Sequence, residues 1–225
     1  MEDVKNKGEK KEVLNKLVKV FWVFIIGSVI GYVLEMIVGL VQNGHFVSRQ
    51  GLLIGPFIQV YGLGLVTYYL VISKIKDKNN VKIFILSMIL GGVIEYLFSF
   101  FQEKLFGTIS WDYSNLPFNI NGRTSLLHCL YWGTGGVLFV KFILPYIDGL
   151  DNLYKYKAYK IITSFLIVFI CFDIIISGLA GIRCLERRRN MEAKNDIDVF
   201  FDVYYPDSKL KEIYSNAKEV KIDEL

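Results

Sequence analysis

Four acidic residues lie within strongly apolar stretches of this sequence, where a carboxylate loses its hydration. They are Glu35, Glu95, Glu103 and Asp173. An ionisable group inside a membrane is costly, and its default interpretation is a functional site with an identifiable partner. Carboxylates of this kind can bind a proton, a cation or a basic group of a solute. Arg49 and Arg123, each directly before an apolar segment, can pair with them or bind an anionic head group.

The apolar stretches are long enough to cross a membrane. The chain has 225 residues, of which 53% are hydrophobic and 21% charged. A helix needs roughly 20 apolar residues to span a bilayer core. Five segments qualify, at about 17–41, 51–73, 81–106, 124–147 and 160–182. Period-2 alternation is absent, so we predict an all-α, polytopic membrane helical bundle of about five transmembrane helices.

Small residues recur at four-residue spacing, and the acids lie on the same helix faces. The third segment has Ser87, Gly91, Glu95, Ser99 and Glu103, and the first has Gly27, Gly31, Glu35 and Gly39. Such stripes let helices approach closely, so packing explains the glycines. For the acids, a functional site and structural ion pairs both remain open. Gly55-Pro56 can interrupt the second helix.

Alternate crossing places the ends of odd segments and the starts of even segments on one side of the membrane. All four acids and both arginines then fall in the same half, which suggests a cavity open to one face. Two short motifs also occur twice: residues 31–35 and 91–95 share GxxxE, and RxxLL begins at both Arg49 and Arg123. This recurrence suggests a parallel two-helix repeat followed by a fifth helix. By analogy with Glu35 and Arg49, we expect Glu95 and Arg123 to be coupled.

The link before Arg123 is longer than its counterpart by about 14 residues and reads GTISWDYSNLPFNINGR. Trp111 suits a membrane interface, and Asp112 can cap a turn or hydrogen-bond a ligand. One interpretation is a structured turn that anchors two helices. The alternative is a lid or binding loop over the acids.

Several kinds of site are not indicated by the sequence. His45 and His128 lack ligand spacing with the three cysteines, so we expect no metal and no other cofactor. No phosphate-binding loop or hydrolase nucleophile motif is present. The net charge of +4 comes from lysines beside the apolar segments, which argues against nucleic-acid binding.

The lysine bias favours a cytoplasmic N-terminus. Positive residues crowd the N-terminal arm and two alternate loops: Lys5, Lys7, Lys10, Lys11, Lys16, Lys19, Lys74, Lys76, Lys78, Lys82, Lys155, Lys157 and Lys160. The arginines at 183 and 187–189 conflict with this orientation, because five crossings would place them on the extracytoplasmic side. We divide the chain into an arm (1–16), a transmembrane domain (17–183) and a charged tail (184–225). The tail is either solvated or a membrane-surface or partner-binding segment.

A set of motifs over about 20–180 resembles a known bacterial family. The motifs are RQGLLIGP from Arg49, Tyr61-Gly62, GVIEY from Gly92, WDYS from Trp111, PFN from Pro117 and Gly122-Arg123. They are similar to the family called putative ABC-transporter type IV, which are permease-like membrane proteins. The resemblance implies a permease component in the bacterial cytoplasmic membrane, served by a separate ATPase subunit.

Three functions therefore remain open. The first is a transport component, working as a homodimer with an ATPase, in which the acids, the arginines, Trp111 and Asp112 bind a solute. The second is a membrane-embedded enzyme acting on a lipid or lipid-linked substrate. The third is a membrane scaffold whose charges are only structural. The transport component is the function we favour, and with it a non-enzymatic chain.

Overall fold

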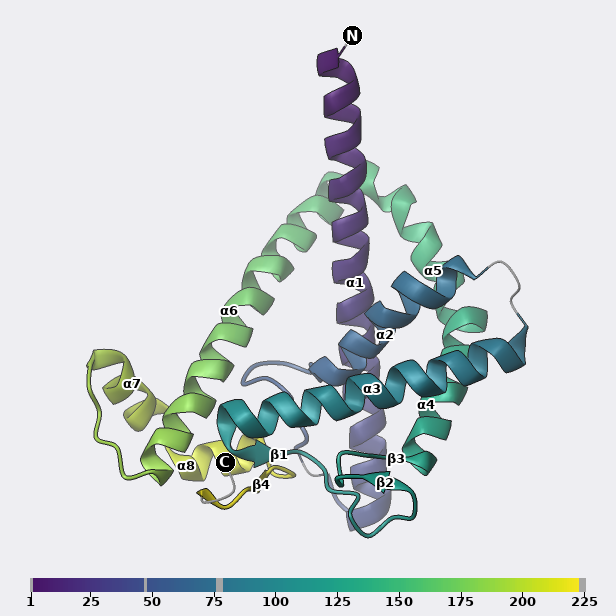
Figure 1. The fold of residues 1–225 in the computed structure, drawn as a ribbon. Helices are drawn as coiled ribbons and strands as arrows, with labels where there is room; N and C mark the ends of the chain where they lie inside the picture. The colour runs from purple at the N-terminus through teal and green to yellow at the C-terminus, as the bar shows by residue number, and fades with distance from the viewer. Residues whose placement is uncertain (1, 47, 76–78, 223–225) are drawn as a thin grey trace.

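The computed structural model describes residues 2–46, 48–75 and 79–222 and is predominantly helical (Figure 1). The helices are α1 (Glu2–Asn43), α2 (Gln59–Val71), α3 (Asn80–Phe106), α4 (Leu126–Leu138), α5 (Leu144–Gly149), α6 (Lys157–Arg188), α7 (Asp196–Tyr204) and α8 (Asp207–Ile213). A π-helical turn, Phe139–Ile143, joins α4 to α5, and 3-10 turns at Ile72–Lys74 and Leu150–Lys155 follow α2 and α5. The predicted all-α membrane bundle is confirmed.

Four helical stretches among the described residues are long and apolar enough to cross a membrane. They are Glu9–Asn43, Asn80–Phe106, Leu126–Lys155 and Lys157–Arg188. The predicted second segment, 51–73, differs, because only Gln59–Val71 forms an α-helix. Pro56 lacks an N–H, and Gly55 adopts a φ of +82°, so residues 51–58 follow an irregular path before α2 begins.

Irregular backbone is tolerated at membrane depth only where protein groups satisfy its hydrogen bonds. Two of the donors of this segment are satisfied by α6. The backbone N–H of Leu53 donates to Ser177 Oγ at 2.8 Å, and that of Ile54 donates to Asp173 Oδ1 at 3.1 Å. Asp173 is fully buried. The acid of the last span therefore holds the broken second segment in place.

Glycines bring the helices together in two pairs, α1 with α2 and α3 with α4. A Cβ on Gly31 would overlap the Tyr61 ring, and one on Gly91 would overlap Trp132. The main apolar core lies in the half of the bundle away from the acids. It contains Val23, Leu65, Tyr68, Ile72, Ile83, Phe139, Leu144 and Ile147. The small-residue stripes thus do the packing that their spacing predicts.

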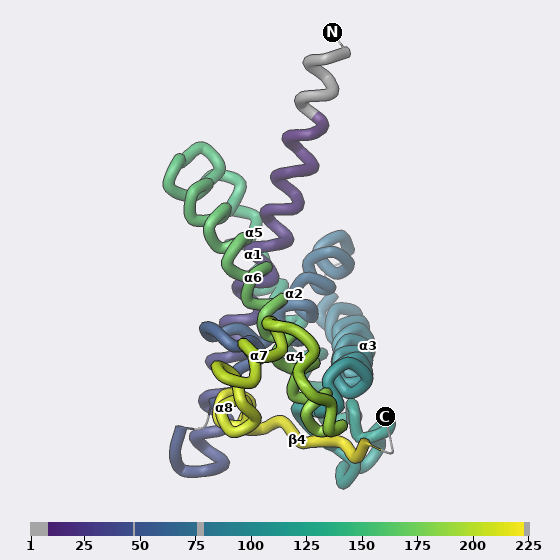
Figure 2. The backbone as a smooth tube through the Cα atoms, turned by 90° about the vertical axis from the view of Figure 1, so that its left-hand side faces the viewer, coloured from purple at the N-terminus to yellow at the C-terminus, as the bar shows by residue number. Residues whose placement is uncertain are grey.

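The C-terminal tail folds back on the end of the bundle where the α1–α2 and α3–α4 links lie (Figure 2). Strand β4 (Lys218–Glu219) pairs antiparallel with β1 (Thr108–Ile109), directly after α3. An isolated bridge joins Arg49, in the first link, to Tyr214. Ordered pairing of this kind differs from the solvated tail that composition suggested. Helix α6 also continues to Arg188, beyond the predicted domain boundary at 183.

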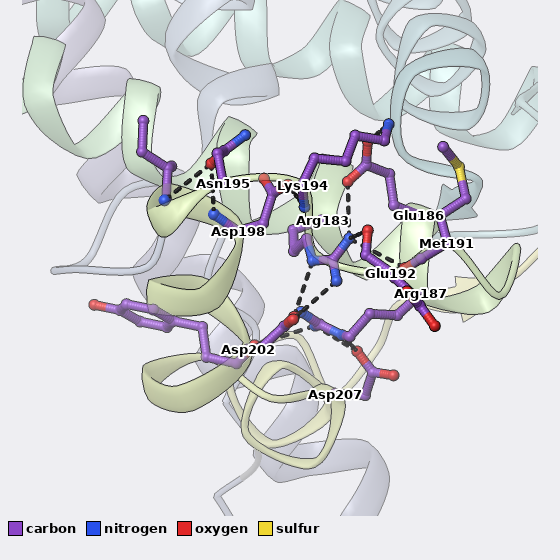
Figure 3. Close-up of polar contacts among 12 residues, drawn as sticks. Arg183, Glu186, Arg187, Met191, Glu192, Lys194, Asn195, Asp198, Asp202 and Asp207 are labelled. Carbon is purple, nitrogen blue, oxygen red and sulfur yellow. Dashed lines mark hydrogen bonds and ion pairs between the residues drawn. The ribbon is translucent and has the colours of Figure 1, made fainter.

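The arginines that opposed the predicted orientation are paired within the tail (Figure 3). Arg183 is only 3% exposed and contacts Asp202 at 2.8 Å and Glu186 at 3.1 Å. Arg187 reaches Asp202 at 2.7 Å and also Asp207. Acids of the same region thus compensate the charges of Arg183 and Arg187 at the end of α6.

Asp202 is expected to make the docking of the tail sensitive to acid. Its hydrogen bonds with Arg183 and Arg187 hold its pKa below the ordinary value of 3.8. The ionised form therefore contributes stability above pH 3.8, and this contribution is lost as pH falls through the lower, folded pKa. Hydrogen exchange of α7 should accelerate selectively as pH is taken below 3.8, after correction for intrinsic exchange.

At neutral pH, Asp202→Asn should cost about 2–3 kcal/mol, because the buried guanidinium of Arg183 loses one of its two acidic partners. Asp196→Asn is the matched control on the same helix, since Asp196 takes part in none of the ion pairs found among the described residues. Equal α7 exchange in the two variants would contradict this account.

Gly91→Ala is expected to destabilise the bundle by about 1–3 kcal/mol, because the added methyl overlaps Trp132. Gly135→Ala, on α4, is the control, since its Cβ would meet open space. That change should leave stability unchanged or raise it by up to about 1 kcal/mol through helix propensity. Thermal unfolding in one detergent compares the two, and an equal effect would refute the packing role of Gly91.

Candidate functional site

Glu95 is a buried carboxylate that is held by neutral hydrogen-bond donors. It lies on α3 and is 6% exposed. Thr124, in strand β3 (Thr124–Ser125), donates its hydroxyl to Oε2 at 2.7 Å. Tyr113, from the α3–α4 link, donates its hydroxyl to Oε1 at 3.2 Å. None of the ion pairs described for residues 2–46, 48–75 and 79–222 involves Glu95, so this acid is desolvated without a compensating cation.

Glu35 lies in a different electrostatic environment, beside a guanidinium. Arg49 Nη1 contacts Glu35 Oε2 at 2.9 Å, as the sequence pairing predicted. Arg49 Nη2 also donates to Gln42 Oε1 at 3.0 Å. On the other side, Tyr61 of α2 donates its hydroxyl to Glu35 Oε1 at 2.7 Å. This pair is partly buried and therefore strong enough to fix the link against α1.

Two aromatic side chains meet between the two helix pairs. The ring of Tyr61, whose hydroxyl donates to Glu35, lies with its centroid 5.6 Å from that of Trp132 on α4. Sequence reasoning missed Tyr61 and Trp132 as site residues. The sequence signal for these two residues was indirect, because it lay in the glycines: Tyr61 and Trp132 fill the spaces that Gly31 and Gly91 leave open.

Arg123 forms its ion pair with Glu103 and not with Glu95. Arg123 Nη2 contacts Glu103 Oε2 at 2.7 Å, and both side chains are 14% exposed. Its guanidinium also lies over the rings of Tyr96 and Phe100, at 5.8 and 5.4 Å from their centroids. The predicted Glu95–Arg123 partnership is therefore corrected. Eight residues separate the two glutamates, about 12 Å along a helix, so one guanidinium serves only one of them.

The α3–α4 link explains why Arg123 pairs with Glu103 and not with Glu95. Strand β2 (Asn119–Ile120) pairs with β3 in a tight hairpin, with Asn121 and Gly122 at positive φ. This turn carries Arg123 toward the end of α3 while its neighbour Thr124 points at Glu95. A simple repeat of the shorter first link would have lacked this hairpin.

Trp111 and Asp112 hold the link itself. Trp111 Nε1 donates to the backbone carbonyl of Arg123 at 2.8 Å, and its ring stacks on Phe98. Asp112 Oδ1 accepts from the Ser114 hydroxyl at 2.6 Å and from the Ser114 N–H at 3.0 Å. These bonds lower the pKa of Asp112. Both side chains therefore act in a structured turn, the first of the two interpretations from sequence.

Tyr113 is the residue of the link that reaches the acids. Its ring stacks on His128 with centroids 3.6 Å apart, and His128 Nδ1 lies 2.8 Å from Ser125 Oγ. Burial raises the pKa of Tyr113, with a further contribution from Glu95, so its hydroxyl stays protonated and donates to Glu95. The link thus anchors the helices and also covers Glu95 with one side chain.

Asp173 does not join this group. Its described hydrogen bonds run to the irregular segment before α2 and to Ser177, at 3.2 Å. Glu103 and Asp173 thus serve separate structural contacts, and a pocket shared by the intramembrane acids stays a prediction.

The apolar helices and the polar group between them define a multi-pass α-helical membrane protein. Over residues 22–178 the chain matches the family described as putative ABC-transporter type IV, and it belongs to that family. Searches of curated proteins and of solved structures gave no match.

A pair of double-mutant cycles tests the arrangement of the charges. Glu103→Gln with Arg123→Gln should show a coupling of about 1–2 kcal/mol in the free energy of unfolding, because the two side chains touch in a largely buried site. Glu95→Gln with Arg123→Gln should show less than about 0.5 kcal/mol. A larger coupling in the second cycle would restore the partnership that the sequence suggested.

Proposed function

We propose that the protein is a permease-like transport component in which Glu95 binds the moving cation, either a proton or a cationic group of the solute. The observation that carries this proposal is the environment of Glu95: buried, hydrogen-bonded by neutral donors and unpaired with any described cation. A carboxylate in such a place is stabilised when it takes up positive charge.

The two ion pairs of the site hold in place the elements around Glu95. The Glu35–Arg49 and Glu103–Arg123 pairs each tie a link to the end of the helix before it. Because the two charges of each pair compensate each other, neither pair needs a counter-ion. They set the positions of Tyr61 and Tyr113, which approach the acids from opposite halves of the chain.

The interrupted second segment fits transport. Transporters bind solutes where a spanning helix is broken and its backbone is satisfied by protein. Here residues 51–58 are irregular and the 13-residue α2 follows them, with Tyr61 in its first turn. A shift of α2 along α1 would move the Tyr61 hydroxyl relative to Glu35 and open or close the route to Glu95.

We further propose a bacterial plasma-membrane location with a cytoplasmic N-terminus, and a separate ATPase subunit that docks at the end opposite the acids. The lysines of that end include Lys74 after α2 and Lys155, Lys157 and Lys160 around the start of α6. Lys19 of α1 is paired with Asp151 there at 2.6 Å, which joins the first span to the turn before α6. A homodimer would double the number of spans.

Glu95→Gln is the decisive substitution. Gentle purification followed by mass spectrometry should find a cationic solute retained by the unchanged protein and reduced at least tenfold in this variant. If the cation is a proton, no solute is retained, and proton uptake into liposomes holding the purified protein, together with any copurifying ATPase, should be lost instead. Glu9→Gln, at an exposed position of α1, is the matched control.

Stability separates a binding carboxylate from a structural one. Glu95→Gln should leave the free energy of unfolding unchanged or raised, because it removes an uncompensated buried charge. Glu35→Gln should lower it by about 2–3 kcal/mol, since Arg49 loses its partner. A strongly destabilised Glu95→Gln with unchanged solute retention and proton uptake would show that the protein is a scaffold.

A further inference from the structure

An apolar groove runs along the outer face of α3 and α4. Its volume is about 390 Å³, and the β2–β3 hairpin closes one end. Its walls include Ile89, Val93, Leu97 and Leu126, with Ile120 contributed by the hairpin. Ile89, Val93 and Ile120 are 50–58% exposed, so the groove opens outward from the bundle.

The floor of this groove is thin and adjoins Glu95. It contains Gly92, Thr124 and Cys129. Gly92 has no side chain to fill the space, and a Cβ there would lie 2.6 Å from Cys129 Sγ. On the inner side, Thr124 makes its 2.7 Å hydrogen bond to Glu95. A single layer of side chains therefore separates the groove from the buried carboxylate.

We propose that this groove binds one acyl chain of a membrane lipid. Both helices that form it are candidate spans, so their outer faces meet the bilayer. The lining is apolar apart from two hydroxyls and the Cys129 thiol; Thr124 donates to Glu95, and Tyr96 accepts from Asn121 Nδ2 at 3.1 Å. A polar solute would find few hydrogen-bond partners there, such as the Tyr96 O–H, whereas a hydrocarbon chain requires none.

The length of the groove favours a chain over a helix of a second copy. Along α3 it extends from Met88 to Leu97, about 13 Å at the rise of a helix. A bilayer core is roughly 30 Å thick, and a packed transmembrane helix would make contacts along most of that distance. The groove stops at the hairpin, where Ile120 closes it.

An acyl chain in this place contacts Thr124 and can restrain its side chain. The bound lipid would then stabilise the hydroxyl in the position that donates to Glu95. This inference needs no transport activity, so it stands or fails independently of the proposed function.

Photolabelling in lipid nanodiscs tests the proposal. The probe is phosphatidylglycerol with a diazirine near the end of one acyl chain, added to a bilayer of unlabelled phosphatidylglycerol and phosphatidylethanolamine. Mass spectrometry of the digested protein should find label concentrated in residues 88–97 and 120–129. Ile89→Trp and Val93→Trp, which fill the groove, should each reduce this label at least fivefold.

Ile85→Trp is the control on the same exposed ridge, one turn before Ile89. Helical side chains lean toward the N-terminus, so this indole points away from the groove and should leave the labelling unchanged. Thermal unfolding confirms that all three variants are folded. Label spread evenly over the outer helix faces, or equal labelling in groove-filled and control variants, would overturn the proposal.

A second copy in the groove is the remaining outcome to exclude. Val93→Cys, treated with a thiol cross-linker in the same nanodiscs, should give no more linkage between copies than the unchanged protein, which already carries an exposed Cys171. Efficient linkage between copies through position 93 would show that another chain covers the groove, and the lipid assignment would then be wrong.

Discussion

Every polar group within the membrane layer of this protein must find its partner inside the protein, because lipid offers none. The consequences are visible throughout the fold. The N–H groups freed by the break before α2 are accepted by Asp173 and Ser177 of a helix more than a hundred residues away. Arg49 and Arg123 reach back to the helices that precede them. Glu95 stands apart from this pattern, since its partners are hydroxyl groups and not a cation.

The two helix pairs pack in the same way but differ in where their arginines form ion pairs. In each, a glycine of the first helix accommodates a large aromatic ring from the second, Tyr61 in one case and Trp132 in the other. The first pair then directs its arginine to the GxxxE glutamate, whereas the second, with its longer link, directs it toward the helix end. If the halves arose by duplication, the insertion in the link released one glutamate from ion pairing.

Much of this arrangement could be predicted from the sequence. The four-residue spacing located the packing faces, Gly55-Pro56 marked the interrupted span, and the Glu35–Arg49 contact followed from alternate crossing. The role of Tyr113 could not be predicted, because it depends on a hairpin whose register is set by pairing between residues 119–120 and 124–125. Asp173 was misplaced for a similar reason, since its contact with the broken segment is to the backbone N–H of Ile54, which carries no sequence signal.

The pairing of β1 with β4 has a consequence for biogenesis. Thr108 emerges from the ribosome long before Glu219, its partner across the sheet, has been translated. The same delay applies to Arg49 and Tyr214. The spans are therefore inserted before the residues that pair with the first and second links have been synthesised. A ribosome stalled between residues 189 and 213 would leave an inserted chain in which neither pairing has formed.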